Sequence, residues 1–210
     1  MNKVVLLAGV ACLFATNVFA ADFNPYVSAK LKYVYSQNKE KIKGVYLDEA
    51  FKETGHLNKG VFGGSFATGV ISPLEYGAVR MELEYAQNAD AKKGHGDEKT
   101  TIETRAGFVN AYYDFDLNQS VPLTPYIGMG LGWGHFEVKD DEGPLKKNGL
   151  AFNVGAGVSY AMSKNLALDT GYRFVRYAPI KKTYKDDEGM LKVRTQSRAH
   201  EIYAGLRYSF

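Results

Sequence analysis

The sequence predicts an all-β fold, an eight-stranded antiparallel up-and-down transmembrane β-barrel. Three observations lead to this prediction. Apolar and polar residues alternate over segments of about ten residues, which is the period of a strand. The stretches between these segments alternate between long and short along the chain. The last segment, IYAGLRYSF, alternates up to a terminal aromatic residue.

Composition limits the classes that fit. A chain of 210 residues with 45% hydrophobic and 23% charged residues favours one folded domain and excludes outright disorder. The net charge of +3, from 26 basic and 23 acidic residues, is too weak a bias to indicate a nucleic-acid partner.

The first twenty residues resemble a secretion signal, so the expected organisation is a signal peptide over 1–20 and a barrel domain over 21–210. Lys3 gives a short basic start, and an apolar run of about a dozen residues follows, too short to cross a bilayer as a helix. The only cysteine, Cys12, lies in this segment, where lipid attachment is the alternative. The mature chain is therefore expected to contain no disulfide.

The first four strands are expected at 26–35, 61–71, 79–85 and 101–115. Glycines blur the alternation in the second, and the parity around Arg105 in the fourth does not match, which predicts a β-bulge there. One face of these strands carries Val27, Ala29, Leu31, Tyr33, Tyr35, Phe62, Phe66, Val70, Val79, Met81, Leu83, Tyr85, Val109, Ala111, Tyr113 and Phe115.

The last four strands are expected at 127–134, 152–160, 166–177 and 202–210. Their apolar face carries Ile127, Met129, Leu131, Trp133, Phe152, Val154, Ala156, Val158, Tyr160, Leu168, Thr170, Tyr172, Phe174, Ile202, Ala204, Leu206, Tyr208 and Phe210. The long connections, at 36–59, 87–100, 139–148 and 178–198, are expected to be loops at one end of the barrel, with both termini at the other end.

Which face points inward is decided by volume. Eight strands enclose a space that side chains just fill, and four or five bulky apolar residues per strand would overcrowd it. Glycines and opposite charges fit there instead, so the apolar face is expected to meet lipid. The lumen is then expected to hold a network of ion pairs formed by Lys30, Lys32, Arg80, Glu82, Glu84, Asp169, Arg173, Glu201 and Arg207. Aromatic residues near the strand ends are expected to form interfacial girdles, namely Tyr33, Tyr35, Tyr85, Trp133, Tyr160, Tyr172, Tyr177, Tyr208 and Phe210.

The run HEIYAGLRYSF resembles the C-terminal assembly signal of bacterial outer-membrane barrels, carried here by Ile202, Leu206, Tyr208 and Phe210. The segments NPYVSAKLKY, NAYYDF, TPYIGMGLGWG and NVGAGVSYAMSKNLALDTGYRF are similar to the opacity-type surface proteins, relatives of the eight-stranded domain of outer-membrane protein A. This resemblance implies a monomeric barrel in the outer membrane of a Gram-negative bacterium, inserted by the assembly machinery, with periplasmic termini and four exposed loops that are often adhesive or antigenic.

Several alternatives stay open at this stage. A lipid-A-modifying enzyme would need a Ser beside His135 or His200 on the lipid face, a narrow small-solute porin would need an open lumen, and a secreted carrier would keep its apolar face inside. The motif KDDEG, at 139–143 and 185–189, predicts two hairpin tips, with calcium binding as the alternative. The glycines at 128–134 lack the spacing of a phosphate-binding loop. We expect no catalytic residues, cofactor or metal.

The last long connection is the most basic. It carries six cationic residues, which could meet lipopolysaccharide phosphates or an acidic glycan or matrix component of a host, namely Lys181, Lys182, Lys185, Lys192, Arg194 and Arg198. The expected function is therefore that of a surface protein with a structural or adhesive role and no large pore.

Overall fold

The computed structural model describes residues 23–46, 49–93, 100–117, 122–140, 143–186 and 189–210. Its strands are β1 (Asn24–Tyr46), β2 (Glu49–Leu74), β3 (Gly77–Lys93), β4 (Thr100–Phe115), β5 (Leu123–Asp140), β6 (Gly143–Ala161), β7 (Leu166–Tyr177), β8 (Ile180–Asp186) and β9 (Gly189–Ser209). The expected signal peptide lies outside the described residues, as does Cys12. No helix able to span a bilayer occurs in the described ranges.

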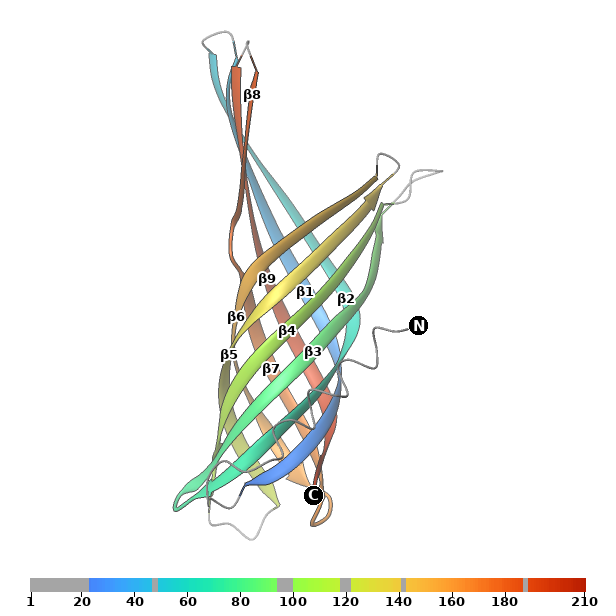
Figure 1. Ribbon diagram of the computed structural model, residues 1–210, viewed down its shortest axis with the longest axis vertical. Helices are drawn as coiled ribbons and strands as arrows, with labels where there is room; N and C mark the ends of the chain where they lie inside the picture. Colours follow the sequence, from blue (N-terminus) through green and yellow to red (C-terminus); the bar gives the residue numbers. More distant parts are fainter. Residues whose placement is uncertain (1–22, 47–48, 94–99, 118–121, 141–142, 187–188) are drawn as a thin grey trace.

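The strands close into a barrel, as Figure 1 shows. Each strand from β1 to β7 pairs antiparallel with the next, β7 pairs with β9, and β9 returns to β1 with Tyr26 opposite Ser209. The short strand β8 also pairs with β9, so β7 and β8 are two parts of one long strand interrupted at residues 178–179. The barrel thus has eight strands, which confirms the predicted fold class.

Short connections and both ends of the described chain lie at one end of the barrel. The β2–β3 turn closes with Leu74 opposite Gly77, where a Cβ atom would collide with the backbone oxygen of Asp114. The amide of Phe210 donates to the carbonyl of Pro25 over 3.0 Å, so the end of β9 is fixed to the start of β1.

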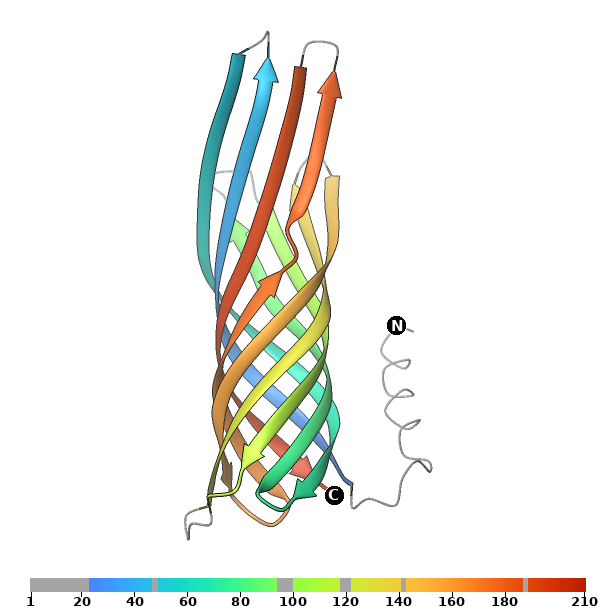
Figure 2. The ribbon, with the colours of Figure 1, turned by 90° about the vertical axis from the view of Figure 1, so that its left-hand side faces the viewer.

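The prediction of long loops at the opposite end is wrong over most of their length, because the strands continue. β1 pairs with β2 up to Tyr46 opposite Glu49, and with β9 up to Tyr46 opposite Gly189. β2 separates from β3 beyond Gly63. A four-stranded sheet in the order β2-β1-β9-β8 therefore rises past the rest of the barrel (Figures 1 and 2). We call it the blade, and it comprises residues 36–46 of β1, 49–62 of β2, all of β8 and 189–198 of β9.

The sequence does not predict the strands of the blade, and the reason is physical. A strand that has solvent on both faces needs no alternation of apolar and polar residues, since neither face has to be buried. Such a strand is held in the sheet by the hydrogen bonds of its backbone ladder. The predicted hairpin tips at both KDDEG motifs are confirmed by the pairing of Asp140 with Gly143 and of Asp186 with Gly189.

The side chains sort by strand parity as expected, with large apolar groups outside. Leu31, Phe62 and Leu131 are 77%, 72% and 68% exposed, although each lies in a regular strand.

Two expectations, the outward position of Tyr177 and the bulge in β4, are wrong. Tyr177 points inward and is buried, because it shares the parity of Arg173. Strand β4 has no bulge at Arg105; the shift in register lies between Asn88 and Ala91 of β3, and the apparent break in β4 arises because Phe108 faces the lumen.

Candidate functional site

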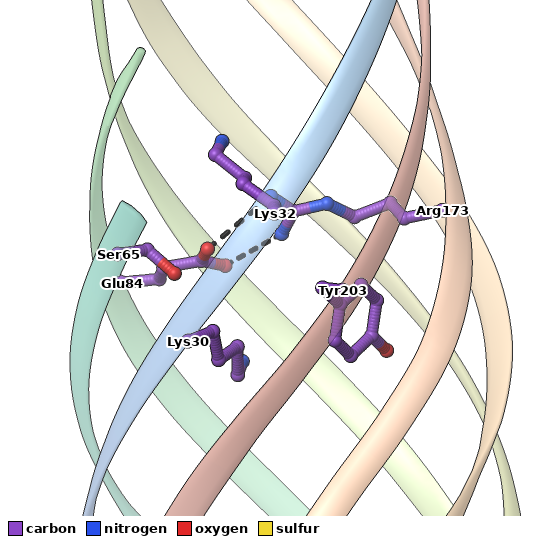
Figure 3. A pocket seen from close by; sticks show the side chains of 6 residues that line it. All are labelled: Lys30, Lys32, Ser65, Glu84, Arg173 and Tyr203. Atoms are coloured by element: carbon purple, nitrogen blue, oxygen red, sulfur yellow. Dashed lines mark hydrogen bonds and ion pairs between the residues drawn. The ribbon is translucent and has the colours of Figure 1, made fainter. Parts of the chain in front are cut away.

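The largest group of interacting polar side chains fills the lumen. Arg173 on β7 lies at its centre, with Nη1 2.6 Å from Oε2 of Glu84 and Nη2 2.6 Å from Oε2 of Glu201. Two lysines of β1 complete this cluster: Lys32 lies 3.2 Å from Glu201, and Lys30 lies 2.8 Å from Glu82. Figure 3 shows Arg173 reaching across the lumen to Glu84.

A second ionic cluster lies nearer the short turns. The Nε atom of Arg80 is 2.7 Å from Asp114, and its Nη1 is 3.4 Å from Asp169. Arg207 approaches the same Asp169 to 3.1 Å and donates to the hydroxyl of Ser159 over 2.7 Å. Asp169 therefore bridges two arginines from different strands.

Tyrosines join the two clusters. The hydroxyls of Tyr26 and Tyr112 donate to Glu82 over 3.1 and 3.2 Å. The guanidinium of Arg80 lies 4.7 Å from the ring centre of Tyr112 and 4.8 Å from that of Tyr126, within the range of a cation–π contact. Tyr112 therefore contacts both clusters, through its hydrogen bond to Glu82 and its cation–π contact with Arg80.

The structure places all nine predicted lumen residues inside the barrel and gives each an oppositely charged partner. Sequence analysis missed Asp114, whose parity with Tyr112 and Asn110 already indicated an inward side chain. Within the described chain, the buried lumen charges balance at five cations and five carboxylates once Asp114 is included. Such balance is expected, because an unpaired charge in this position would be costly.

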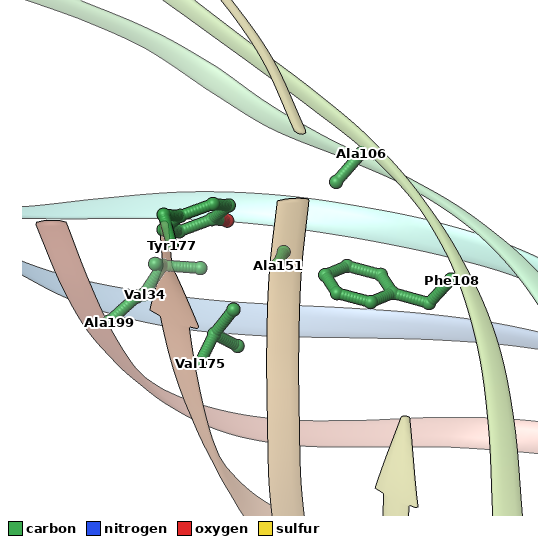
Figure 4. Close-up of a cluster of buried hydrophobic side chains, with 7 residues drawn as sticks. All are labelled: Val34, Ala106, Phe108, Ala151, Val175, Tyr177 and Ala199. Carbon is green, nitrogen blue, oxygen red and sulfur yellow. The ribbon is translucent and has the colours of Figure 1, made fainter. Parts of the chain in front are cut away.

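An apolar layer covers the ionic clusters on the blade side. It consists of Val34, Ala106, Phe108, Ala151, Val175, Tyr177 and Ala199, with Val61 packed against it (Figure 4). Val34 and Val175 each lie two residues further toward the blade than Lys32 and Arg173 on the same strands. Below this layer, the space between Lys30, Ser65 and Glu84 is filled by side chains and leaves no room for a water molecule.

The glycine row of β5 makes room for this packing. A Cβ at Gly130 would meet the side-chain amides of Asn110 and Asn153, and one at Gly132 would meet the ring of Phe108 and the backbone oxygen of Gly107. The row thus serves close packing.

Cationic side chains form a second candidate site, on the outer face of the blade and of the adjoining end of β7. The alternation that puts Tyr33 and Tyr35 outside continues to Lys39, Lys41 and Lys43 on the same face. Across the ladder, Lys41 is opposite Arg194. On the other side of β9, Arg198 is opposite Arg176 of β7.

We call this site the cationic face and define it by its described side chains: Lys39, Lys41, Lys43, Arg176, Arg194 and Arg198. No Asp or Glu shares the face among the described residues of the blade. Sequence analysis identified only Arg194 and Arg198, since it treated 36–59 as a separate loop. The side chains of Lys181, Lys182, Lys185 and Lys192 lie outside the described part, although the backbone register sets Lys181 opposite Arg194 and Lys43 opposite Lys192.

His135 and His200, on which the enzyme alternative depends, have hydrogen-bond partners other than serine. His135 is hydrogen bonded to Asn148 over 2.5 Å, and His200 to the hydroxyl of Tyr172 over 2.6 Å. These contacts are hydrogen bonds to an amide and to a phenol, and neither supplies the serine that the lipid-modifying alternative needs.

Comparisons with known proteins agree with this architecture. The family described as the outer membrane protein beta-barrel domain matches residues 5–210. Outer membrane protein PagN of Salmonella typhimurium is 29% identical over 180 residues, which are 72% of this chain and 74% of that protein. Opacity protein opA67 of Neisseria gonorrhoeae is 23% identical over 62% of this chain and 64% of its own length.

Among solved structures, Neisserial surface protein A superimposes with a TM-score of 0.53 at 22% identity, over 85% of this chain and 97% of that one. At that identity the likeness concerns the fold alone.

Proposed function

From the premise that the chain belongs to the outer membrane protein β-barrel domain family, we propose that its sealed barrel anchors the blade, and that the cationic face binds acidic polysaccharide at the cell surface. The protein lies in the outer membrane of a bacterium, with its long hairpins extracellular and its termini periplasmic. The lipid-facing surface meets outer-membrane lipid.

The observation that carries the proposal is the pairing of like charges across the ladder. Lys41 is the register partner of Arg194, and Arg176 is that of Arg198. Like charges directly opposite each other in a ladder are destabilising, and an anion bound between them would relieve the repulsion. A guanidinium group binds a sulfate or phosphate through two hydrogen bonds. A polysaccharide that carries several sulfates or phosphates would therefore engage several cationic pairs at once. The chemistry fits a sulfated or phosphorylated polysaccharide.

Two sources can supply that chemistry. The cationic face begins beyond Tyr33 and Tyr35, which lie where an outer girdle is expected, so Arg176 and Arg198 are nearest the lipid and Lys43 is furthest. Lipopolysaccharide phosphates of the same membrane would occupy the lower pair, whereas a glycan or matrix component of a host would contact the upper residues. We propose the host glycan as the ligand of the upper residues.

The barrel itself supports no transport role. Its lumen is closed by the apolar layer and by two layers of paired charges. We propose that it is a monomer, because the closed ladder needs no partner subunit, and that the assembly machinery reads the exposed Phe210 with Ile202, Leu206 and Tyr208 on the same face.

The test is binding of heparin to the protein in lipid nanodiscs, with fully desulfated heparin and lipopolysaccharide as the other arms. The double variant Lys41→Gln/Arg194→Gln should weaken heparin binding, and added salt should weaken it further, because the attraction is screened. The control Arg105→Gln/Lys164→Gln removes two charges outside the cationic face. Equal binding by both variants, or of desulfated heparin, would remove the proposal.

A further inference from the structure

The blade has two open edges, and one of them is long. From Glu49 to Phe62, β2 pairs with β1 on one side, and β3 joins its other side only at Gly63. In the part of the chain that the structure describes, no strand covers this edge. Alternate backbone N–H and C=O groups of residues 54–58, within this stretch, are therefore available to pair with an added strand.

The two edges differ in how well they are protected. The other edge, β8, has seven residues, of which Lys181, Lys182 and Lys185 are lysines, and short lysine-rich strands are the usual protection against pairing with foreign chains. On the edge of β2, Lys52 and Lys59 flank the segment TGHLN at 54–58, which itself contains no lysine, arginine or proline. Its pairing with β1 is regular, without a bulge, and Thr54, His56 and Asn58 are exposed.

We infer that the free edge of β2 binds an extended acidic segment of a partner protein by adding it as a fifth strand to the blade. This inference goes beyond the proposed glycan ligand, because it concerns a different part of the blade and a protein partner. Strand addition obtains affinity from main-chain hydrogen bonds and selectivity from the side chains at alternate positions.

Charge complementarity decides the character of the partner. An added strand would lie one strand spacing from His56 and Thr54, and two spacings, about 10 Å, from Lys39 and Lys41, which are their register partners on β1. Aspartate or glutamate at alternate positions of that strand would face these lysines. A second copy of this chain is disfavoured, since it would bring another cationic face alongside the first.

The probe is a synthetic peptide of twelve alternating aspartate and threonine residues, added to the full-length protein in nanodiscs. Hydrogen–deuterium exchange should show that alternate amides of 54–58 exchange fast in the free protein and become protected when the peptide binds. The same peptide with every amide N-methylated keeps its charges but cannot form a ladder. It should bind at least about tenfold more weakly, because several main-chain hydrogen bonds are lost.

A pair of variants tests the location. Asn58→Asp puts a negative charge on the edge and should weaken peptide binding about two- to fivefold through like-charge contact. Gln87→Glu adds the same charge on β3, outside the blade, and should leave binding unchanged. Equal binding of the N-methylated peptide, or amides of 54–58 that stay unprotected, would overturn strand addition even if heparin still binds. Peptide-independent dimers with the same amides protected would make a second copy the occupant, and would also overturn it.

Discussion

Replacing Arg173 by methionine should destabilise the barrel more than any other single change of charge in the lumen. Its guanidinium contacts Glu84 through Nη1 at 2.6 Å and Nη2 at 3.2 Å, and Glu201 through Nε at 2.8 Å and Nη2 at 2.6 Å. After substitution, Glu84 keeps only the amide of Asn110 at 2.7 Å as a described hydrogen-bond donor, and Glu201 keeps Lys32 at 3.2 Å. Glu84 and Glu201 are then two buried carboxylates with too little positive charge nearby to balance them.

The cost of leaving a buried charge without its partner is about 3–5 kcal/mol, and this is the expected loss in the free energy of unfolding for Arg173→Met. The double variant Arg173→Met/Glu84→Gln removes one of the stranded charges, so it should lose less than the single variant. The matched control is Arg176→Met, three residues further along β7 with an exposed side chain opposite Arg198. It should change the free energy of unfolding by less than about 1 kcal/mol, in the stabilising direction, because it removes a like-charge pair.

The assay is reversible urea unfolding in phospholipid vesicles, followed by the fluorescence of Trp133, the single tryptophan of the chain. A loss for Arg173→Met no greater than that for Arg176→Met would refute the idea that paired charges hold the lumen together. So would a double variant that is less stable than the single one, since the stranded carboxylate would then not be the source of the cost.

Further outcomes follow from the packing of the lumen. Gly132→Ala should lower the free energy of unfolding by about 1–3 kcal/mol in the same assay, because its Cβ meets the Phe108 ring and a backbone oxygen. The control Gly107→Ala, whose Cβ has its nearest atom at 4.0 Å, should not destabilise the protein. Equal effects of the two substitutions would contradict the close packing. In planar bilayers the protein should show no large, stable channels, and Phe108→Ala should lower stability by about 3–5 kcal/mol without opening one, because the ionic layers remain. Large channels in either protein would contradict a sealed lumen.

Strand periodicity was sufficient to predict the barrel and the inward charges, because burial in the lumen and contact with lipid impose opposite polarities on alternate residues. The sequence analysis places Tyr177 outside and does not recognise Phe108 as a lumen residue, and the reason is the same for both. An apolar residue inside the lumen is of the same type as one that faces lipid, and only its parity along the strand distinguishes the two. The cationic face could not be assembled from sequence, since Lys41 and Arg194 are distant in the chain and meet only through the continued ladder of β1 and β9.

The sidedness of the barrel is tested most directly by quenching Trp133 with lipids brominated in their acyl chains. Its indole is 54% exposed on the outer face of β5, next to Leu131 on the same face. We expect strong quenching by brominated lipid and weak quenching by aqueous acrylamide. Fluorescence that brominated lipid leaves unchanged, in a protein that stays dissolved and monodisperse without detergent, would show that the apolar face points inward.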